Sequence, residues 1–277
     1  MKARGLGWLA LACLVALYVV AFATSLGRRV DAGLFRRVSD TDLDHVSWVG
    51  YRVLHTVDAA SVCLIGGSIV LVGLVRGRSA RAVAAAVVLL GSLATTEIVK
   101  LSLAPLDRVL APHRGSKWEG SFPSGTATIA MALALGAVLV APRALRLATA
   151  LVGSVYAAAT GVALVADAWH YPSDVVAGFL VAAAWCAIAL LGLRAWGERA
   201  DGHFVIRHER IGLYVALGLA AAFCAVLALI LVTHPVIVDA LRLKPAFAAT
   251  GVALALLSVA IVGSATVLAR EPVQPAA

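Results

Sequence analysis

A histidine and an aspartate four residues apart could provide a nucleophile and the group that orients it. His170 is followed by Tyr171, Pro172, Ser173 and Asp174. Proline suits the first turn of a helix and disfavours helical geometry in the residue before it, so the spacing predicts His170 just before a helix and Asp174 in its first turn. A carboxylate there could hold one imidazole nitrogen and leave the other free to attack. The alternative is an interfacial histidine beside an aspartate that favours a helix N-terminus.

A second segment, Pro123-Ser124-Gly125-Thr126, is typical of a helix start that binds an anion. Serine is a natural N-cap, and glycine lets a ligand approach the backbone closely. Unpaired N–H groups at such a start attract negative charge. The simpler alternative is a helix start without a ligand.

Two basic residues that precede this segment, Lys100 and Arg108, could neutralise a phosphate. Glu97 lies one helical turn before Lys100 and could pair with it. The alternative is that both cations reach toward lipid head groups, as Lys and Arg near the end of a membrane span commonly do.

The composition indicates which kind of structure must position these residues. The chain has 277 residues, of which 62% are hydrophobic and 14% are charged. A soluble domain carries roughly 45–50% apolar and about 25% charged residues, and a surface that faces water cannot hide such an excess. Composition therefore excludes a soluble enzyme, a secreted disulfide scaffold and a disordered chain, and it predicts a protein that spans a membrane.

About 20 apolar residues are needed for a helix to cross a bilayer, and eight stretches of this chain reach or approach that length. They lie at residues 6–26, 57–75, 80–100, 124–141, 144–166, 173–194, 211–232 and 246–269. The sequence thus predicts an all-α, polytopic membrane helical bundle of about eight transmembrane helices. The first stretch, which follows Lys2 and Arg4, could alternatively be a cleaved signal peptide.

Antiparallel packing of these helices would bring the candidate residues to one membrane face. Lys100 ends the third stretch, Ser124 begins the fourth, His170 follows the fifth and Asp174 begins the sixth. Residues that are far apart in sequence would then share one pocket that water can reach.

The charges of the connectors favour a cytoplasmic N-terminus and a site on the outer face. The short connectors 76–81 and 143–146 are basic, whereas 167–174 contains no Lys or Arg. Connector 28–58 alternates polar with apolar residues and carries several aspartates. We expect it to form an interfacial helix on the outer surface.

Several other functions fit the sequence poorly. Ionisable residues are almost absent from the spans, which disfavours an ion-coupled transporter. The net charge of +8 is spread over the connectors, so anionic lipid head groups are the expected partners and nucleic acid is not. The four cysteines all lie in apolar runs, which indicates neither a disulfide framework nor a metal site.

Together these segments resemble the type 2 phosphatidic acid phosphatase superfamily of membrane lipid-phosphate phosphatases. The motifs of that family are K-x-x-x-x-x-x-R-P, P-S-G-H and S-R-x-x-x-x-x-H-x-x-x-D. They correspond here to Lys100 to Arg108, Pro123 to Thr126, and Ala163 to Asp174. The resemblance covers about the first six spans, so we expect a six-span core in residues 1–200. Residues 201–277 would add two transmembrane helices and a short tail.

The resemblance implies an activity and a role for each candidate residue. His170 would attack phosphorus and Asp174 would orient it. The phosphate-binding residues would be Lys100, Arg108, Ser124, Gly125 and Thr126. The substrate would be a polyprenyl (di)phosphate or a glycerolipid phosphate at the extracytoplasmic face of a bacterial-type plasma membrane, and the scheme requires no metal or cofactor.

The chain also departs from the family pattern. Thr126 stands in place of the P-S-G-H histidine, which is a general acid in the family, and Leu164 and Ala163 replace the arginine and serine of the third motif. Asp107 occupies the expected arginine position of the first motif, one residue before Arg108. Losing a general acid typically lowers a rate by about 10²–10⁴.

These departures leave three functions open. The first is a phosphatase that favours diphosphates, because a leaving phosphate needs less protonation than a leaving alkoxide. The second is a catalytically weakened or inactive family member that binds anionic lipid or an envelope-assembly partner. The third is a transporter or flippase for a lipid-linked anion.

Overall fold

All the secondary-structure elements of the described part of the chain are helices. The computed structural model describes residues 3–39, 50, 52–110, 122–195 and 244–269. Its elements are α1 (Ala3–Tyr18), the π-helix η1 (Val19–Ala23), α2 (Ser25–Ser39), the 3-10 helix η2 (His55–Val57), α4 (Ala59–Val75), α5 (Ser79–Leu110), α6 (Gly125–Val140), α7 (Arg146–Ala166), α8 (Pro172–Ala195) and α11 (Pro245–Leu268).

The lengths and composition of these helices make the chain an integral membrane protein. Five helical segments are long and apolar enough to cross a membrane, namely Ala3–Ala23, Ser79–Asp107, Arg146–Ala166, Pro172–Ala195 and Pro245–Leu268. Two shorter apolar helices, α4 and α6, lie at the second and fourth expected spans. The expected span at 211–232 lies outside the described residues, so seven of the eight expected spans correspond to described helices.

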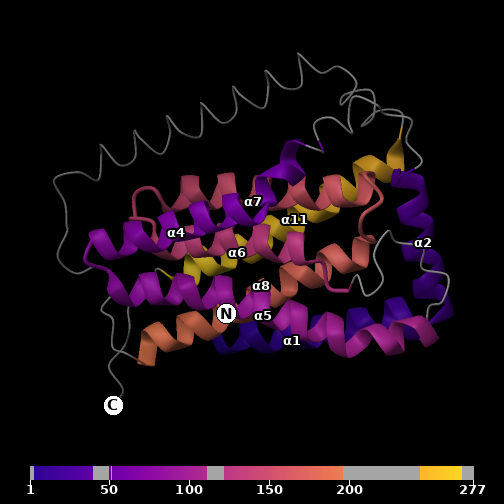
Figure 1. Ribbon diagram of the computed structural model, residues 1–277, viewed down its shortest axis with the longest axis horizontal. Coiled ribbons are helices and arrows are strands. Elements are labelled where there is room, and N and C mark those ends of the chain that lie inside the picture. The colour runs from indigo at the N-terminus through magenta and orange to yellow at the C-terminus, as the bar shows by residue number, and fades with distance from the viewer. Residues whose placement is uncertain (1–2, 40–49, 51, 111–121, 196–243, 270–277) are drawn as a thin grey trace.

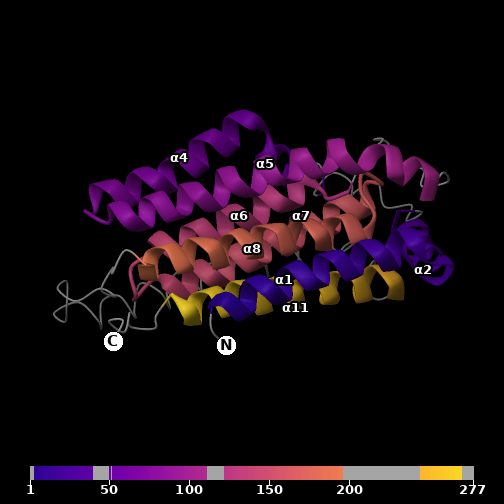
Figure 2. The same ribbon diagram turned by 90° about the horizontal axis from the view of Figure 1, so that it is seen from below.

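Helix α6 is the centre of the bundle. It contacts α4, α5, α7, α8 and α11, and most of its residues are buried. Figure 2 shows α6, α7 and α8 between α4 and α5 on one side and α1 and α11 on the other. Small residues permit this packing: a Cβ built on Gly153 of α7 would lie 2.8 Å from the Cβ of Ala134. Close approach of backbones at small residues is a common way for helices to associate in membranes.

Two buried arginines donate hydrogen bonds to backbone carbonyl groups at the end of the bundle where α6 ends. Arg81, at the start of α5, donates to the carbonyl oxygen of Leu139 at 3.0 Å. Arg146, at the start of α7, donates to those of Ala141 and Ala269 at 3.2 Å each. Carbonyl groups in the last turn of a helix lack partners within the helix, so these arginines satisfy the ends of α6 and α11. The tight turn expected between the fourth and fifth spans is present, with Leu145 N donating to Pro142 O at 3.0 Å.

Helix α5 is longer than the sequence predicts. The expected span ended at residue 100, whereas the helix continues to Leu110 and contains Pro105. Lys100 and Arg108 therefore lie within the helix. Lys100 is about 32 Å along the axis from Ser79, which is close to the hydrocarbon thickness of roughly 30 Å.

Helix α2 lies across the other end of the bundle (Figure 1). It is the amphipathic helix expected in connector 28–58: Asp31, Phe35 and Val38 are buried, while Arg36 and Arg37 are exposed. Helix α4 begins near this end with Asp58 as its N-cap. The backbone N–H and the hydroxyl of Ser61 hold the pKa of the Asp58 carboxyl below its ordinary value.

Candidate functional site

The turn between α7 and α8 is held in one conformation by backbone hydrogen bonds. Ala168 has a positive φ of 57°. Its N–H donates to Val165 O at 3.2 Å, and the N–H groups of Trp169 and His170 donate to Leu164 O at 2.9 and 3.1 Å. This is the pattern of a Schellman motif, in which glycine usually occupies the left-handed position. It fixes the backbone just before His170.

His170 and Asp174 face each other across the start of α8, as the sequence predicts. The His170 Nδ1 atom lies 3.6 Å from Asp174 Oδ2, an ion-pair separation that is longer than a hydrogen bond. His170 is 8% exposed and Asp174 is fully buried. The same Oδ2 atom accepts from the Tyr171 N–H at 3.2 Å. The carboxylate therefore faces Nδ1 of the imidazole, which leaves Nε2 as the nitrogen for other chemistry.

A direct hydrogen bond joins the start of α6 to the start of α8. Ser124 N donates to the carbonyl oxygen of Asp174 at 2.9 Å. Ser124 is the N-cap of α6, and its side chain accepts from Ala127 N at 3.4 Å. The Thr128 hydroxyl donates to Ser124 O at 2.7 Å. Two of the predicted segments, which are about 50 residues apart, thus meet at one place.

Close packing at one glycine permits this meeting. A Cβ built on Gly178 of α8 would lie 2.7 Å from Ser124 O and 2.9 Å from Thr128 N. Because both of these are backbone atoms, neither could give way easily. Helix α8 can approach the start of α6 so closely only because residue 178 has no side chain.

Lys100 brings a positive charge to the same helix start. A Cβ built on Gly125 would lie 3.0 Å from Lys100 Nζ and 3.4 Å from Glu97 Oε1. Lys100 Nζ is 2.9 Å from Glu97 Oε1, and Lys100 is the more buried of the two side chains. The ammonium group therefore lies against the first residue of α6, where an anion would also meet the helix dipole.

For the other predicted residues, the structure shows burial or the contact of a neighbouring residue. Thr126 is half-buried in the first turn of α6. Arg108 belongs to α5, but its side chain lies outside the described part of the structure. Asp107, next to it, accepts from the Tyr18 hydroxyl at 2.9 Å. Leu164, at the position of the family arginine, is fully buried.

The structure adds two residues that the sequence analysis did not single out. Asp31 of α2 accepts from Ser173 N at 3.1 Å and from the Ser173 hydroxyl at 2.6 Å. The only sequence signal was the recurrence of Asp31, Phe35 and Val38 on one helical face, which marks a buried face but names no partner. Among the described residues, no group of three or more His, Cys, Asp or Glu side chains could hold a metal ion.

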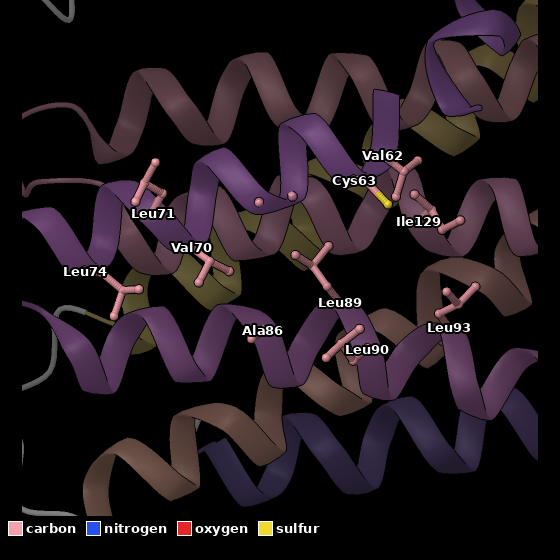
Figure 3. A pocket seen from close by; sticks show the side chains of 12 residues that line it. Val62, Cys63, Val70, Leu71, Leu74, Ala86, Leu89, Leu90, Leu93 and Ile129 are labelled. Atoms are coloured by element: carbon pink, nitrogen blue, oxygen red, sulfur yellow. The ribbon is translucent and has the colours of Figure 1, made fainter. Parts of the chain in front are cut away.

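An apolar groove runs between α4 and α5 (Figure 3). Its volume is about 440 Å³. One end is lined by Leu93 and Ile129, and the other by Leu74 and Ala86. Leu93 is two helical turns before Lys100, about 10 Å along the axis, and Ile129 is one turn after Gly125. One end of the groove therefore lies about 10 Å along α5 from Lys100, and the groove runs from there along the apolar length of the helices.

The part of the chain that contains these residues matches a protein family. Residues 81–198 match the model of the PAP2 superfamily. This segment of the chain is similar to the PAP2 superfamily. It confirms the resemblance drawn from the three motifs, and it contains Lys100, Ser124, His170 and Asp174 together with α6, α7 and α8. Helices α1, α2, α4 and α11 lie outside it. No curated protein and no solved structure matches the chain.

Proposed function

We propose that the protein is a membrane phosphatase that hydrolyses a lipid phosphate with His170 as the nucleophile. The observation that carries this proposal is the hydrogen bond from Ser124 N to Asp174 O at 2.9 Å. It joins the helix start beside Lys100 to the helix start that holds the His170–Asp174 pair. An imidazole, an ammonium group and unpaired helix N–H groups at one place suit the transfer of a phosphoryl group.

The reaction has two steps. In the first, Nε2 of His170 attacks phosphorus, and the bond from phosphorus to the leaving oxygen breaks with its electron pair on that oxygen. Asp174 faces Nδ1 and stabilises the positive charge that develops on the imidazole. In the second step, water attacks the phosphohistidine, which releases inorganic phosphate and restores the imidazole. Lys100 and the N–H groups that begin α6 stabilise the phosphoryl oxygens in both steps.

The groove between α4 and α5 supports a substrate with a hydrocarbon chain. It is apolar and lies beside the same two helices, α5 and α6, that present Lys100 and Gly125. A phosphate group at the start of α6 would leave its chain free to follow the groove along the membrane. This favours a polyprenyl or glycerolipid phosphate over a soluble phosphate ester.

The proposal includes an orientation and a division of the chain. The basic connectors 76–81 and 143–146 lie at the end opposite the site, which supports a cytoplasmic N-terminus and an extracytoplasmic site. We place a six-helix core in residues 1–200 and two additional helices in 201–277. Helix α11 packs against α7, so at least one of the additional helices would stabilise the core.

Phosphate release by the purified protein tests the proposal. Wild type would be compared with His170→Ala, Asp174→Ala and His55→Ala on a panel of lipid mono- and diphosphates. We expect His170→Ala to lower turnover by about 10³-fold or more and Asp174→Ala by up to about 10⁴-fold. The control His55→Ala changes an exposed histidine outside the site and should leave turnover unchanged. Turnover that survives His170→Ala would refute the proposal.

A catalytically weakened lipid-binding protein is the second candidate, and the buried Leu164 favours it. Leu164 stands where the family has an arginine and supplies no charge to a phosphate. If this candidate is correct, no lipid phosphate is hydrolysed, while binding of anionic lipid vesicles weakens in Lys100→Ala and Arg108→Ala. Movement of intact lipid phosphate across vesicles would instead indicate transport.

A further inference from the structure

A buried carboxylate from the surface helix α2 is inserted at the start of α8. Asp31 is 8% exposed, and it accepts hydrogen bonds from both the backbone N–H and the hydroxyl of Ser173, at 3.1 and 2.6 Å. Burying a charged group is costly unless it is hydrogen-bonded. The two bonds offset part of this cost, and they join residues that are 142 positions apart.

A second contact from α2 holds the same turn. The rings of Phe35 and Tyr171 are stacked, with centroids 4.2 Å apart and planes at 16°. Tyr171 and Ser173 flank Pro172 and lie between His170 and Asp174. Helix α2 therefore contacts the segment between His170 and Asp174 at two points.

The start of α8 explains what Asp31 contributes. The first N–H groups of a helix have no partners within the helix, and a residue just before the helix usually satisfies one of them with a side-chain oxygen. Tyr171, which holds that position, has its ring stacked on Phe35. Asp174 accepts from the Tyr171 N–H. Asp31 accepts from the Ser173 N–H, so no carboxylate of α8 is needed to satisfy that group. The Asp174 carboxylate can therefore face His170.

We propose that Asp31 is a positioning residue for the His170–Asp174 pair. The inference rests on the proposed function of that pair. Asp31 acts through Ser173: it fixes the first turn of α8, and this turn fixes the direction of the Asp174 carboxylate and of the imidazole. It also makes α2, which lies outside the segment that matches the family model, a part of the site.

Three variants separate the hydrogen bonds from the charge. Asp31→Ala removes both bonds, Ser173→Ala removes only the bond to the hydroxyl, and Asp31→Asn keeps an oxygen that can accept from Ser173 N.

Misplacing a reacting group by about 1 Å can lower a rate by about 10²-fold. We therefore expect Asp31→Ala to lower kcat by about 10²-fold, with KM unchanged because the residues proposed to hold the phosphate are untouched. Ser173→Ala should have a smaller effect, and Asp31→Asn should retain most of the activity. Asp58→Ala, which removes the carboxylate that caps α4, is the matched control and should leave kcat unchanged.

Hydrogen exchange of the backbone gives a readout that does not depend on turnover. In Asp31→Ala, the amides of residues 169–171 and 173–175 should exchange faster, while those of α6 and α7 keep their protection. In Asp31→Asn, the amides of residues 169–171 and 173–175 should stay protected. Wild-type kcat and wild-type protection in Asp31→Ala would overturn the inference, and so would a loss of folded protein with normal kcat in the folded fraction. If turnover does not depend on His170, the proposed function fails, and the exchange rates alone decide whether Asp31 fixes this turn.

Discussion

At the scale of single residues, the proposed site combines groups that are suited to binding phosphate with a group that is a poor proton donor to the leaving oxygen. Lys100 Nζ lies against Gly125 at the start of α6, and His170 faces Asp174. Thr126, in the same first turn of α6, carries a hydroxyl, which is a poor general acid. A leaving alkoxide needs a proton more than a leaving phosphate does, so we expect the proposed site to favour diphosphates.

Replacing Thr126 by histidine should change this preference. Thr126→His supplies an imidazole that can donate a proton to the leaving group, which is worth about 10²–10⁴ in rate. We expect turnover of a lipid monophosphate to rise by up to about 10²-fold and turnover of the matching diphosphate to change much less. The ratio of the two rates in wild type and variant is the measurement. A wild type that already prefers the monophosphate would contradict this account of the site.

At the scale of helices, the site depends on how closely α6 and α8 approach. Gly178 faces backbone atoms of Ser124 and Thr128 within 3 Å of the position that a Cβ would take. Any side chain there must push the start of α8 away from the start of α6. The hydrogen bond between Ser124 and Asp174 would lengthen with it.

Gly178→Ala should therefore damage both the fold and the site. Overpacking of this kind typically costs about 1–3 kcal/mol, and turnover should fall with the displacement of Asp174. Gly192→Ala, in the same helix but with no atom within 4 Å of the place that its new methyl group would occupy, is the matched control. The free energy of unfolding in detergent and kcat should change only in Gly178→Ala. Equal behaviour of the two variants would show that the close approach has no role.

The end of α7 allows a similar comparison with the end of α4. Ala168 has a φ of 57° where Gly77 has 69°, and both close a Schellman motif. The left-handed conformation costs an alanine roughly 1–2 kcal/mol. Ala168→Gly should therefore raise the free energy of unfolding by up to about 1 kcal/mol, and Gly77→Ala should lower it by about 1 kcal/mol. A drop in stability in Ala168→Gly would contradict this reading of the turn.

At the scale of the whole molecule, much of the architecture could be predicted because membrane spans leave a strong apolar pattern. The stretches at 57–75, 124–141 and 173–194 correspond to α4, α6 and α8. The convergence of Lys100, Ser124, His170 and Asp174 followed from alternating helix directions alone.

Other features depend on contacts that the sequence does not display. The extension of α5 through Pro105 could not be predicted, because proline ordinarily marks a helix boundary. The contact of Asp31 with Ser173 joins residues 142 positions apart, and no local pattern pairs them. Arg81 and Arg146 likewise donate to carbonyl groups at the ends of other helices. From the sequence, their positions in short basic connectors predicted only the side of the membrane on which they lie.

The groove between α4 and α5 gives a prediction for the molecule as a whole. Gly67 lines the groove, and nothing lies within 4 Å of the position that a Cβ would take there, so Gly67→Phe should fill the groove without disturbing the fold. We expect kcat/KM to fall for a long-chain lipid phosphate and to stay unchanged for a short, soluble phosphate ester. Gly263→Phe, at an equally open glycine on α11, is the control. Equal losses for both substrates would show that the groove does not hold the chain.

We infer that a phosphoryl group passes through His170, where the end of α7 and the starts of α6 and α8 meet beside Lys100 of α5. The most direct test is to quench the protein in base during turnover of a substrate labelled in its phosphate and to locate the label by mass spectrometry. Phosphohistidine is stable in base, and we expect the label on His170 in wild type, none in His170→Ala, and more in any variant that hydrolyses the intermediate slowly. Turnover with no label at residue 170, or with label on another residue, would contradict the account.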